Sequence, residues 1–241
     1  MKFDITLITT GSRPHLLEQS LRSLKENASH WDEHALTLVM DGCSVMDTCT
    51  KAGVVPGRII VNPERQGASR SRNIGASSTP KYLRKDALMV LDDDVYCCKG
   101  WDGQLWEVAK SWPTAIVSGH AHPFNHTVLG WSTNYTATTV ISSVHMLIPW
   151  KVWDAVGFFA EPGGPGGSED VDYCNRAGTV LSGLTGFLFI ISEPQCIIHT
   201  GVGSTSGSKL IGWEQVLENN YKLEKVHGIE GKVLYDVGLL A

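Results

Sequence analysis

Short, almost purely apolar runs alternate with helix-like segments through the first half of this chain. The runs occupy 3–9, 35–41, 58–62 and 87–92. Between the first two, leucines recur at helical spacing within 13–27, where Pro14 suits the first turn. Strands that are apolar on both faces are typical of parallel sheets covered by helices on both sides. The pattern predicts an α/β protein with a Rossmann-like, mostly parallel central sheet.

The second half of the chain shows a less regular pattern. A segment of small residues, "GASRSRNIGASS" at 67–78, still predicts a helix packed closely on the sheet. Further strands are expected at 115–124, 137–149 and 186–201, and helices at 150–157, from Glu169 with Ser168 able to cap it, and at about 209–225. A flexible, glycine-rich loop is expected at 201–208. These elements predict a smaller, mixed-sheet half.

Composition excludes several classes of protein. The net charge of −5 argues against a protein that binds nucleic acid over most of its surface. The segment from Arg58 to Lys85 is nevertheless basic, with seven basic residues and one acidic residue. No apolar run approaches the roughly 18 residues that span a bilayer, and the N-terminus lacks a long apolar signal core. The six cysteines form no C-x-x-C pair. We therefore expect reduced thiols and a cytoplasmic protein without stable membrane insertion.

Three consecutive aspartates, Asp92, Asp93 and Asp94, follow the apolar run that begins at Ala87. Ionising three adjacent carboxyl groups costs free energy unless positive charge is nearby. Carboxylate oxygens at a strand end suit a hard divalent cation such as Mg2+ or Mn2+. Neighbouring residues of an extended strand point to opposite faces, so Asp92 and Asp94 should share a side and hold a metal together with a diphosphate. The alternative is a surface turn of acids, which the apolar lead-in disfavours.

Other polar residues fall at expected strand or helix ends. Asp41 ends the second run and can accept hydrogen bonds from a base or ribose, or can simply form an Asp-Gly turn. Arg70 and Arg72 can donate to phosphates or be ordinary solvated arginines. His199 ends a late strand and can ligate a metal or contact a phosphate, although most lone histidines do neither.

An acidic helix start follows the glycine-rich loop "EPGGPGG". Glu169, Asp170 and Asp172 lie there, and a carboxylate at the edge of a cleft can act as a general base toward an acceptor hydroxyl. Helix N-termini also favour acids for electrostatic reasons alone, so one of the three is expected to serve only as a capping charge.

The order of these pieces resembles the family 2 glycosyltransferases of the GT-A fold. The similar segments are "ITLITTGSRPHLLEQSLRSL", "LVMDGCS", "RQGASRSRNIGAS", "MVLDDDV", "WDAVGFFAE" and "GGSEDVDYCNR", within residues 3 to 200. The resemblance implies a nucleotide-sugar donor, usually UDP-linked, and a divalent cation, Mn2+ or Mg2+. It also implies one GT-A domain, 1–241, with a nucleotide-sugar-binding half at 1–100, an acceptor and catalytic half at 101–208, and a C-terminal helix and tail at 209–241.

The same resemblance implies roles for individual residues. Thr9 and Asp41 would hold the base and ribose, with Arg70 and Arg72 beside the nucleotide. Asp92 and Asp94 match the D-x-D motif, with Asp93 leaving the register open by one residue, and the last aspartate of that motif usually touches the metal. Asp170 matches the base of inverting members, and His199 matches a histidine that some GT-A enzymes place on the metal or diphosphate.

Two departures from the family pattern affect these expectations. Met40 stands where the family usually has an aspartate before Asp41, which puts one ribose contact in doubt. A metal-binding histidine at the position of His199 is more typical of retaining relatives, so the stereochemical outcome stays open.

The expected function is metal-dependent transfer of a sugar to an acceptor hydroxyl. The acceptor is a saccharide or glycoconjugate, or a hydroxymethylated DNA base as in phage-type enzymes, in which case the protein would be virus-encoded and act in the host cytoplasm. The alternatives are a nucleotide-sugar pyrophosphorylase, for which an N-terminal glycine-rich phosphate loop with a lysine is missing, and a non-catalytic sugar-binding module, which would not need both the D-x-D motif and Asp170.

Overall fold

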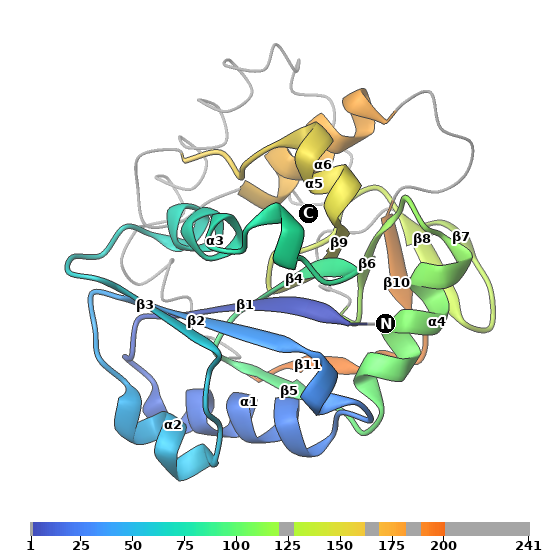
Figure 1. Ribbon diagram of the computed structural model, residues 1–241. Coiled ribbons are helices and arrows are strands. Elements are labelled where there is room, and N and C mark those ends of the chain that lie inside the picture. The colour runs from blue at the N-terminus through green and yellow to red at the C-terminus, as the bar shows by residue number, and fades with distance from the viewer. Residues whose placement is uncertain (1, 121–127, 162–168, 182–188, 201–241) are drawn as a thin grey trace, which may run out of the picture.

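A computed structural model describes residues 2–120, 128–161, 169–181 and 189–200. Its largest sheet has nine strands in the order β3-β2-β1-β4-β9-β6-β10-β8-β7, and a second sheet pairs β11 with β5. Figure 1 shows the helices arranged on both faces of the large sheet. The predicted α/β, GT-A-like architecture is confirmed.

The first half of the chain forms the parallel part of the sheet. β1 (Phe3–Thr9), β2 (Ala35–Asp41), β3 (Arg58–Asn62) and β4 (Ala87–Leu91) run parallel to one another, as predicted. α1 (Pro14–Glu26) and α3 (Ala68–Ser77) also lie where the sequence places helices. The pattern did not reveal the short helix α2 (Met46–Ala52).

The second half adds antiparallel pairings to the same sheet. Its elements are β5 (Val95–Cys97), α4 (Trp101–Ser111), β6 (Ile116–Ser118), β7 (Val128–Trp131), β8 (Tyr135–Thr138), β9 (His145–Pro149), α5 (Trp150–Val156), α6 (Glu169–Val180), β10 (Phe189–Ser192) and β11 (Ile197–His199). β9 lies antiparallel to both β4 and β6, whereas β10 is parallel to β6. The predicted mixed half therefore continues the parallel half within one sheet.

Two segments were each predicted as one strand, and both predictions are wrong because each segment contains parts of two strands. The segment 137–149 contains the end of β8 and all of β9, because the backbone turns at Ser142, whose carbonyl accepts a hydrogen bond from the His145 amide. The segment 186–201 contains β10 and β11, which belong to different sheets. Pro194 lies between them and cannot donate a backbone hydrogen bond to a ladder. Of 115–124, only Ile116–Ser118 is a strand among the described residues.

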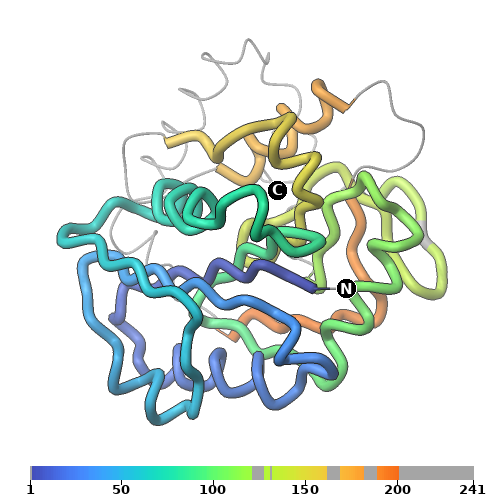
Figure 2. Tube along the Cα trace, in the orientation of Figure 1, coloured from blue at the N-terminus to red at the C-terminus, as the bar shows by residue number. Residues whose placement is uncertain are grey.

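Two apolar cores cover the two faces of the sheet. One contains side chains of α1, α2 and α4, including Leu17, Leu21 and Trp101. The other contains side chains of α5 and α6, including Trp153 and Tyr173. The chain trace in Figure 2 follows these two helical layers on opposite sides of β1 and β4. The sheet is thus held from both sides, which fixes the ends of its central strands.

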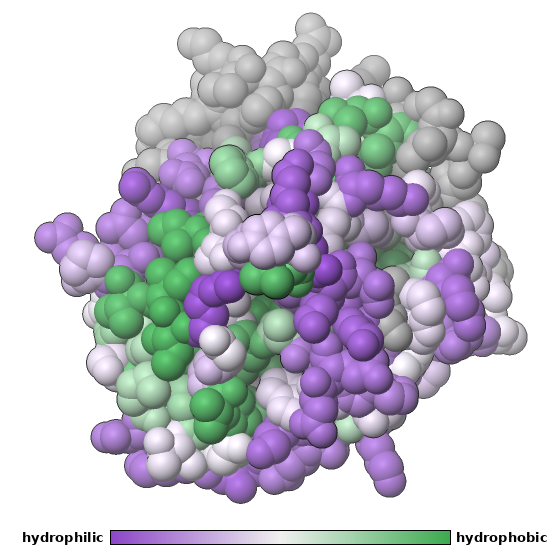
Figure 3. Space-filling model, viewed as in Figure 1, coloured by the Kyte–Doolittle hydropathy of each residue, from purple (hydrophilic) through white to green (hydrophobic). Residues whose placement is uncertain are grey.

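The edge strand β3 is less covered than the central strands. Ile59 and Val61 are exposed, and Figure 3 shows apolar surface on the side of the molecule where β3 lies. The expectation of strands buried on both faces therefore holds for β1 and β4 but not for β3. Within the described part of the chain, none of the helices has the length and apolar character needed to cross a membrane.

Gly75 allows α3 to lie close to the sheet. A Cβ atom at this position would lie 2.3 Å from Thr6 Cγ2 and 3.0 Å from Val39 Cγ2. We expect Gly75→Ala to lower the free energy of unfolding by about 2 kcal/mol, because strand side chains must shift. Urea denaturation measures this change. Gly103→Ala in α4 is the matched control, since nothing lies within 4 Å of its added Cβ. A G75A variant as stable as G103A would contradict the close approach.

Candidate functional site

Polar side chains gather where the central parallel strands end. Thr9 ends β1, Asp41 ends β2, and the aspartate triplet follows β4 directly. β1 pairs in parallel with both β2 and β4, so these three ends lie at the same edge of the sheet. Ligands of open α/β sheets bind at this edge. The structure therefore places Thr9, Asp41 and the triplet at one sheet edge, and their roles in a site stay predictions.

The turn after β4 is anchored by hydrogen bonds to its backbone. The Ser20 hydroxyl of α1 donates to the carbonyl of Asp93 at 2.9 Å and accepts from the Val95 amide at 2.9 Å. From the other side, the hydroxyl of Thr200, the residue after β11, donates to the carbonyl of Asp94 at 2.8 Å. The backbone that carries the aspartates is therefore held between α1 and the end of β11.

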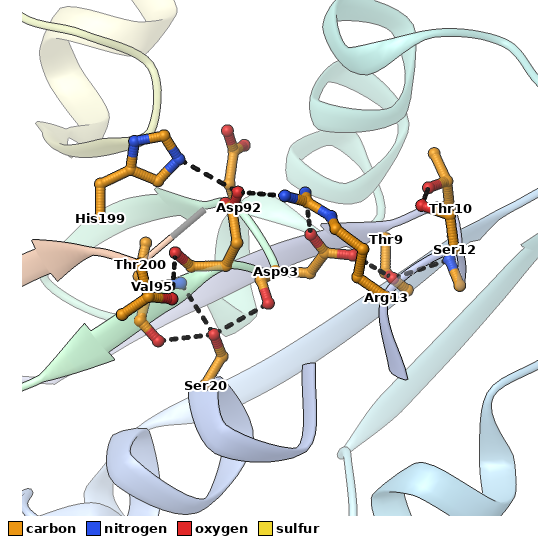
Figure 4. Close-up of polar contacts among 12 residues, drawn as sticks. Thr9, Thr10, Ser12, Arg13, Ser20, Asp92, Asp93, Val95, His199 and Thr200 are labelled. Atoms are coloured by element: carbon orange, nitrogen blue, oxygen red, sulfur yellow. Dashed lines mark hydrogen bonds and ion pairs between the residues drawn. The ribbon is translucent and has the colours of Figure 1, made fainter. Parts of the chain in front are cut away.

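Each aspartate of the triplet contacts at least one arginine. Asp92 Oδ1 accepts a hydrogen bond from Arg72 at 2.6 Å. Arg13, labelled in Figure 4, donates to Asp93 Oδ1 at 3.1 Å. It also donates to Asp94 Oδ2 at 2.7 Å. His199 Nε2 lies 3.0 Å from the same oxygen of Asp94. The sequence predicted positive charge close to the three aspartates. Arg13 and Arg72 supply part of that charge.

The prediction that the side chains of Asp92 and Asp94 point to the same side assumed that both residues lie in a β-strand. That assumption is wrong. β4 ends at Leu91, so the aspartates lie in a bend where alternation does not apply. Asp92 is directed to Arg72 and Asp94 to Arg13 and His199. Burial raises the pKa of Asp92, the charge of Arg72 acts to lower it, and the charge of Asp94 adds to the rise.

The three carboxyl groups differ in acidity. Burial raises the pKa of Asp93 to about 6, against the hydrogen bond from Thr9. Burial also acts to raise the pKa of Asp94, but contacts with His199 and Arg13 hold it below its ordinary value. The hydrogen bond with Asp94 in turn raises the pKa of His199. Asp94 is therefore the triplet residue that keeps its negative charge most readily.

Arg72 links the triplet to α6. Its guanidinium, 2% exposed, donates to Asp92 at 2.6 Å and to Glu169 Oε1 at 2.7 Å. Ser143 also donates to Glu169 Oε1, at 3.0 Å. Arg72 thus positions two acids, whereas the exposed Arg70 has a side chain open to solvent. Their expected contacts with a nucleotide stay predictions.

At the start of α6, Asp170 accepts hydrogen bonds from two backbone amides. Its Oδ1 accepts from the Val171 amide at 2.8 Å, and the Ser143 amide lies 3.4 Å from Oδ2. Burial and the neighbouring charge of Glu169 raise its pKa to about 6. A carboxylate of this acidity is ionised at neutral pH yet basic enough to take a proton. Asp172 instead forms an ion pair with Arg176 at 2.8 Å within the helix.

Asp41 and Thr9 are already engaged with the protein. Asp41 Oδ1 accepts from Asn62 at 2.9 Å and from the Gln66 amide at 2.8 Å, and Oδ2 accepts from the Gly67 amide at 3.0 Å. Asp41 therefore holds the loop that begins α3. Thr9 donates to Asp93 and accepts from the Gly11 amide at 3.0 Å. Base and ribose contacts by these two residues stay predictions.

Sequence reasoning missed Arg13 as a member of this site. The only signal was its place between the end of β1 and Pro14 of α1, at the same sheet edge as the aspartates. The predicted cap at Ser168 and the predicted elements at 201–208 and 209–225 lie outside the described residues.

The charge balance of the site favours a divalent cation. Its acids are Asp92, Asp93, Asp94, Glu169 and Asp170, and its arginines are Arg13 and Arg72. Among the described residues, these five acids and two arginines leave three surplus negative charges when all are ionised and His199 is neutral. Adjacent ligands of an octahedral ion at about 2.1 Å stand about 3 Å apart. The 3.0 Å between Asp94 Oδ2 and His199 Nε2 suits such a pair.

This pair does not complete a metal site by itself. No group of three or more His, Cys, Asp or Glu side chains in the described ranges is arranged to hold a metal ion. Asp94 and His199 can therefore supply two ligands, and a nucleotide diphosphate or water would have to supply the others.

The chain belongs to glycosyl transferase family 2. The profile of the family described as "Glycosyl transferase family 2" matches residues 6–168. A search of curated proteins finds no match. The site residues up to Asp94 thus lie within the matched segment, whereas Asp170 and His199 lie beyond it.

Solved structures show the same fold at low sequence identity. The chain is similar to TarS of S. aureus, with a TM-score of 0.61 and 14% identity over 83% of this chain and 37% of that one. It is also similar to GalNAc-T7, solved with UDP, GalNAc and Mn2+, with a TM-score of 0.63 and 12% identity over 82% of this chain and 43% of that one. The chain therefore spans less than half the length of either structure.

Proposed function

We propose that this protein transfers a sugar from a nucleotide-sugar donor, UDP-linked, to an acceptor hydroxyl, with Mn2+ or Mg2+ at the acidic sheet edge. The observation that carries the proposal is the Asp94–His199 contact of 3.0 Å in a site with surplus negative charge. Membership of family 2 supports glycosyl transfer. The UDP and Mn2+ present in the GalNAc-T7 structure support the choice of donor and cation.

The residues of the chain have separate roles in this proposal. Asp94 and His199 would hold the cation, which neutralises charge on the leaving diphosphate when it is bound. Arg72 fixes Asp92 and Glu169 through contacts of 2.6 and 2.7 Å, so that the acids on β4 and α6 keep their spacing. Preorganised charges of this kind stabilise a transition state without reorganisation.

Asp170 acts as the general base. It takes the proton of the acceptor hydroxyl while the acceptor oxygen bonds to the anomeric carbon and the bond to the diphosphate breaks. The pKa of about 6 leaves Asp170 ionised and able to accept at neutral pH. A base opposite the leaving group corresponds to inversion at the anomeric carbon, which NMR of the product measures directly.

A saccharide or glycoconjugate is the favoured acceptor over a hydroxymethylated DNA base. Four of the seven basic residues between 58 and 85 have partners within the protein: Arg58 on Ser78, Arg72 on Asp92, and Lys81 and Arg84 on Asp154. The acids Asp92 and Asp154 therefore neutralise part of the local basic charge, whereas Arg58 contacts a neutral hydroxyl. A DNA acceptor would give affinity that falls steeply with salt, whereas a neutral saccharide would not. The cytoplasmic location stays a prediction.

A panel of nucleotide-sugars with Mn2+ tests the proposal. We expect UDP release with one donor, abolished by EDTA and accelerated by a saccharide; acceleration by hydroxymethylated DNA instead would contradict the favoured acceptor. Formation of UTP from a UDP-sugar and pyrophosphate would instead identify a pyrophosphorylase. Saccharide binding without turnover of any donor would identify a non-catalytic module.

A further inference from the structure

Arg13 occupies the centre of the acidic site. It lies between the end of β1 and the start of α1, and its side chain crosses to the turn after β4 (Figure 4). Its side chain is 19% exposed, and the carboxylates of Asp93 and Asp94 are 7% and 4% exposed. Salt screens ion pairs as buried as these only weakly. The attraction between Arg13 and the two carboxylates therefore stays strong.

Arg13 shares one oxygen atom with His199. Arg13 Nη1 lies 2.7 Å from Asp94 Oδ2, and His199 Nε2 lies 3.0 Å from that same oxygen. This is the oxygen that, together with His199, would ligate a divalent cation. A guanidinium and a doubly charged ion cannot both sit against one carboxylate oxygen without strong repulsion.

We propose that Arg13 is an internal counter-ion of the metal site, which pairs with Asp94 until the divalent cation displaces it. The inference rests on the proposed function, because it assumes that Asp94 is a ligand. When no metal ion is bound, Arg13 forms ion pairs with Asp93 and Asp94. These buried carboxylates are therefore not left unpaired. The same pairing lowers the affinity for the cation alone.

The displaced guanidinium requires another anion. Its second contact, 3.1 Å from Asp93, keeps it attached to the turn, and the diphosphate of the donor is the anion that enters with the metal. Cation and donor therefore favour each other's binding through Arg13. By linkage this coupling is reciprocal, so the donor also binds more tightly when the cation is present.

Binding of Mn2+ without nucleotide tests the counter-ion role. Bound Mn2+ loses its solution EPR signal, so a titration gives Kd for the full chain. We expect Arg13→Gln to tighten Mn2+ binding about tenfold, on the scale that groups next to metal ligands exert. Arg22→Gln is the matched control: Arg22 lies on α1, the helix that Arg13 precedes, and pairs with Glu18 at 2.7 Å, so its loss should leave Kd unchanged.

Each result of this titration has a defined meaning. Unchanged or weaker Mn2+ binding by R13Q, with normal binding by the unmodified protein, overturns the counter-ion role and leaves the proposed function standing. If neither protein binds Mn2+, the metal part of the proposed function fails together with this inference. Adding Asp94→Asn to R13Q should abolish the gain; a gain that survives places the effect elsewhere and overturns the inference.

A conservative variant covers a failure of R13Q to fold. The single ammonium of Arg13→Lys can pair with one carboxylate rather than two. We expect R13K to bind Mn2+ more tightly than the unmodified protein, and equal or weaker binding overturns the inference. The melting temperature gives a further readout. In EDTA R13Q should melt below the unmodified protein, and Mn2+ should raise its Tm by more.

Discussion

Replacing Asp170 by Asn is expected to lower kcat for sugar transfer by about 1,000-fold, the scale of a lost general base. Asn keeps the size of the side chain and can still accept the hydrogen bond from the Val171 amide at 2.8 Å. Donor affinity, measured by calorimetry with UDP and Mn2+, should therefore stay within about twofold, because only proton transfer is lost.

The control for this variant is Asp154→Asn. Asp154 is a partly exposed acid of α5 that pairs with Lys81 and Arg84, and its loss should leave kcat unchanged. Transfer by D170N at the normal rate would show that another group removes the proton. The pH profile gives a second check. Activity should rise through about pH 6 and level off above it, because the base acts only when ionised and burial sets the pKa of Asp170 to about 6.

Replacing Asp94 by Asn is expected to remove Mn2+-dependent transfer, with a loss of at least about 100-fold in kcat/KM at fixed Mn2+. The amide lacks the negative charge that contacts with His199 and Arg13 maintain on Asp94. Part of the loss should be recovered at high Mn2+, because the remaining ligands still bind weakly. A metal titration of initial rates measures both effects.

Asp86→Asn is the matched control for D94N. Asp86 immediately precedes β4, at the opposite end of the strand from the triplet, and accepts a hydrogen bond from the Lys2 amide at 2.7 Å. D86N should keep full activity. Undiminished Mn2+-dependent turnover by D94N would exclude Asp94 as a metal ligand. The ligand would then have to be another aspartate of the triplet.

The parallel half of the fold was predictable because burial dictates its sequence. β1 and β4 lie inside the sheet, so every residue from Phe3 to Thr9 is buried, and only Asp4, Thr6 and Thr9 in that strand are polar. The mixed half was harder to predict, because its strands are short and one apolar run can contain parts of two strands. β9 is separated from β8 only by a turn at Ser142, and nothing in apolar periodicity marks that turn.

The candidate site was predictable in its location but less so in its contacts. Parallel strands bring their carboxyl ends together, so Thr9, Asp41 and the triplet could be grouped from the order of elements. Ion pairs such as Arg13 with Asp94 join residues 81 positions apart and depend on side-chain directions that no local pattern encodes. For the same reason, the use of Asp41 to hold the start of α3 was not foreseen.

A crystal structure with Mn2+ and UDP, using anomalous scattering at the manganese edge, measures the site most directly. We predict one strong peak in contact with Asp94 and His199 and with the diphosphate of UDP, and the Arg13 guanidinium moved off Asp94. A manganese peak elsewhere, or UDP bound away from the carboxyl ends of β1 and β4, would contradict the assignment of the acidic sheet edge as the donor site.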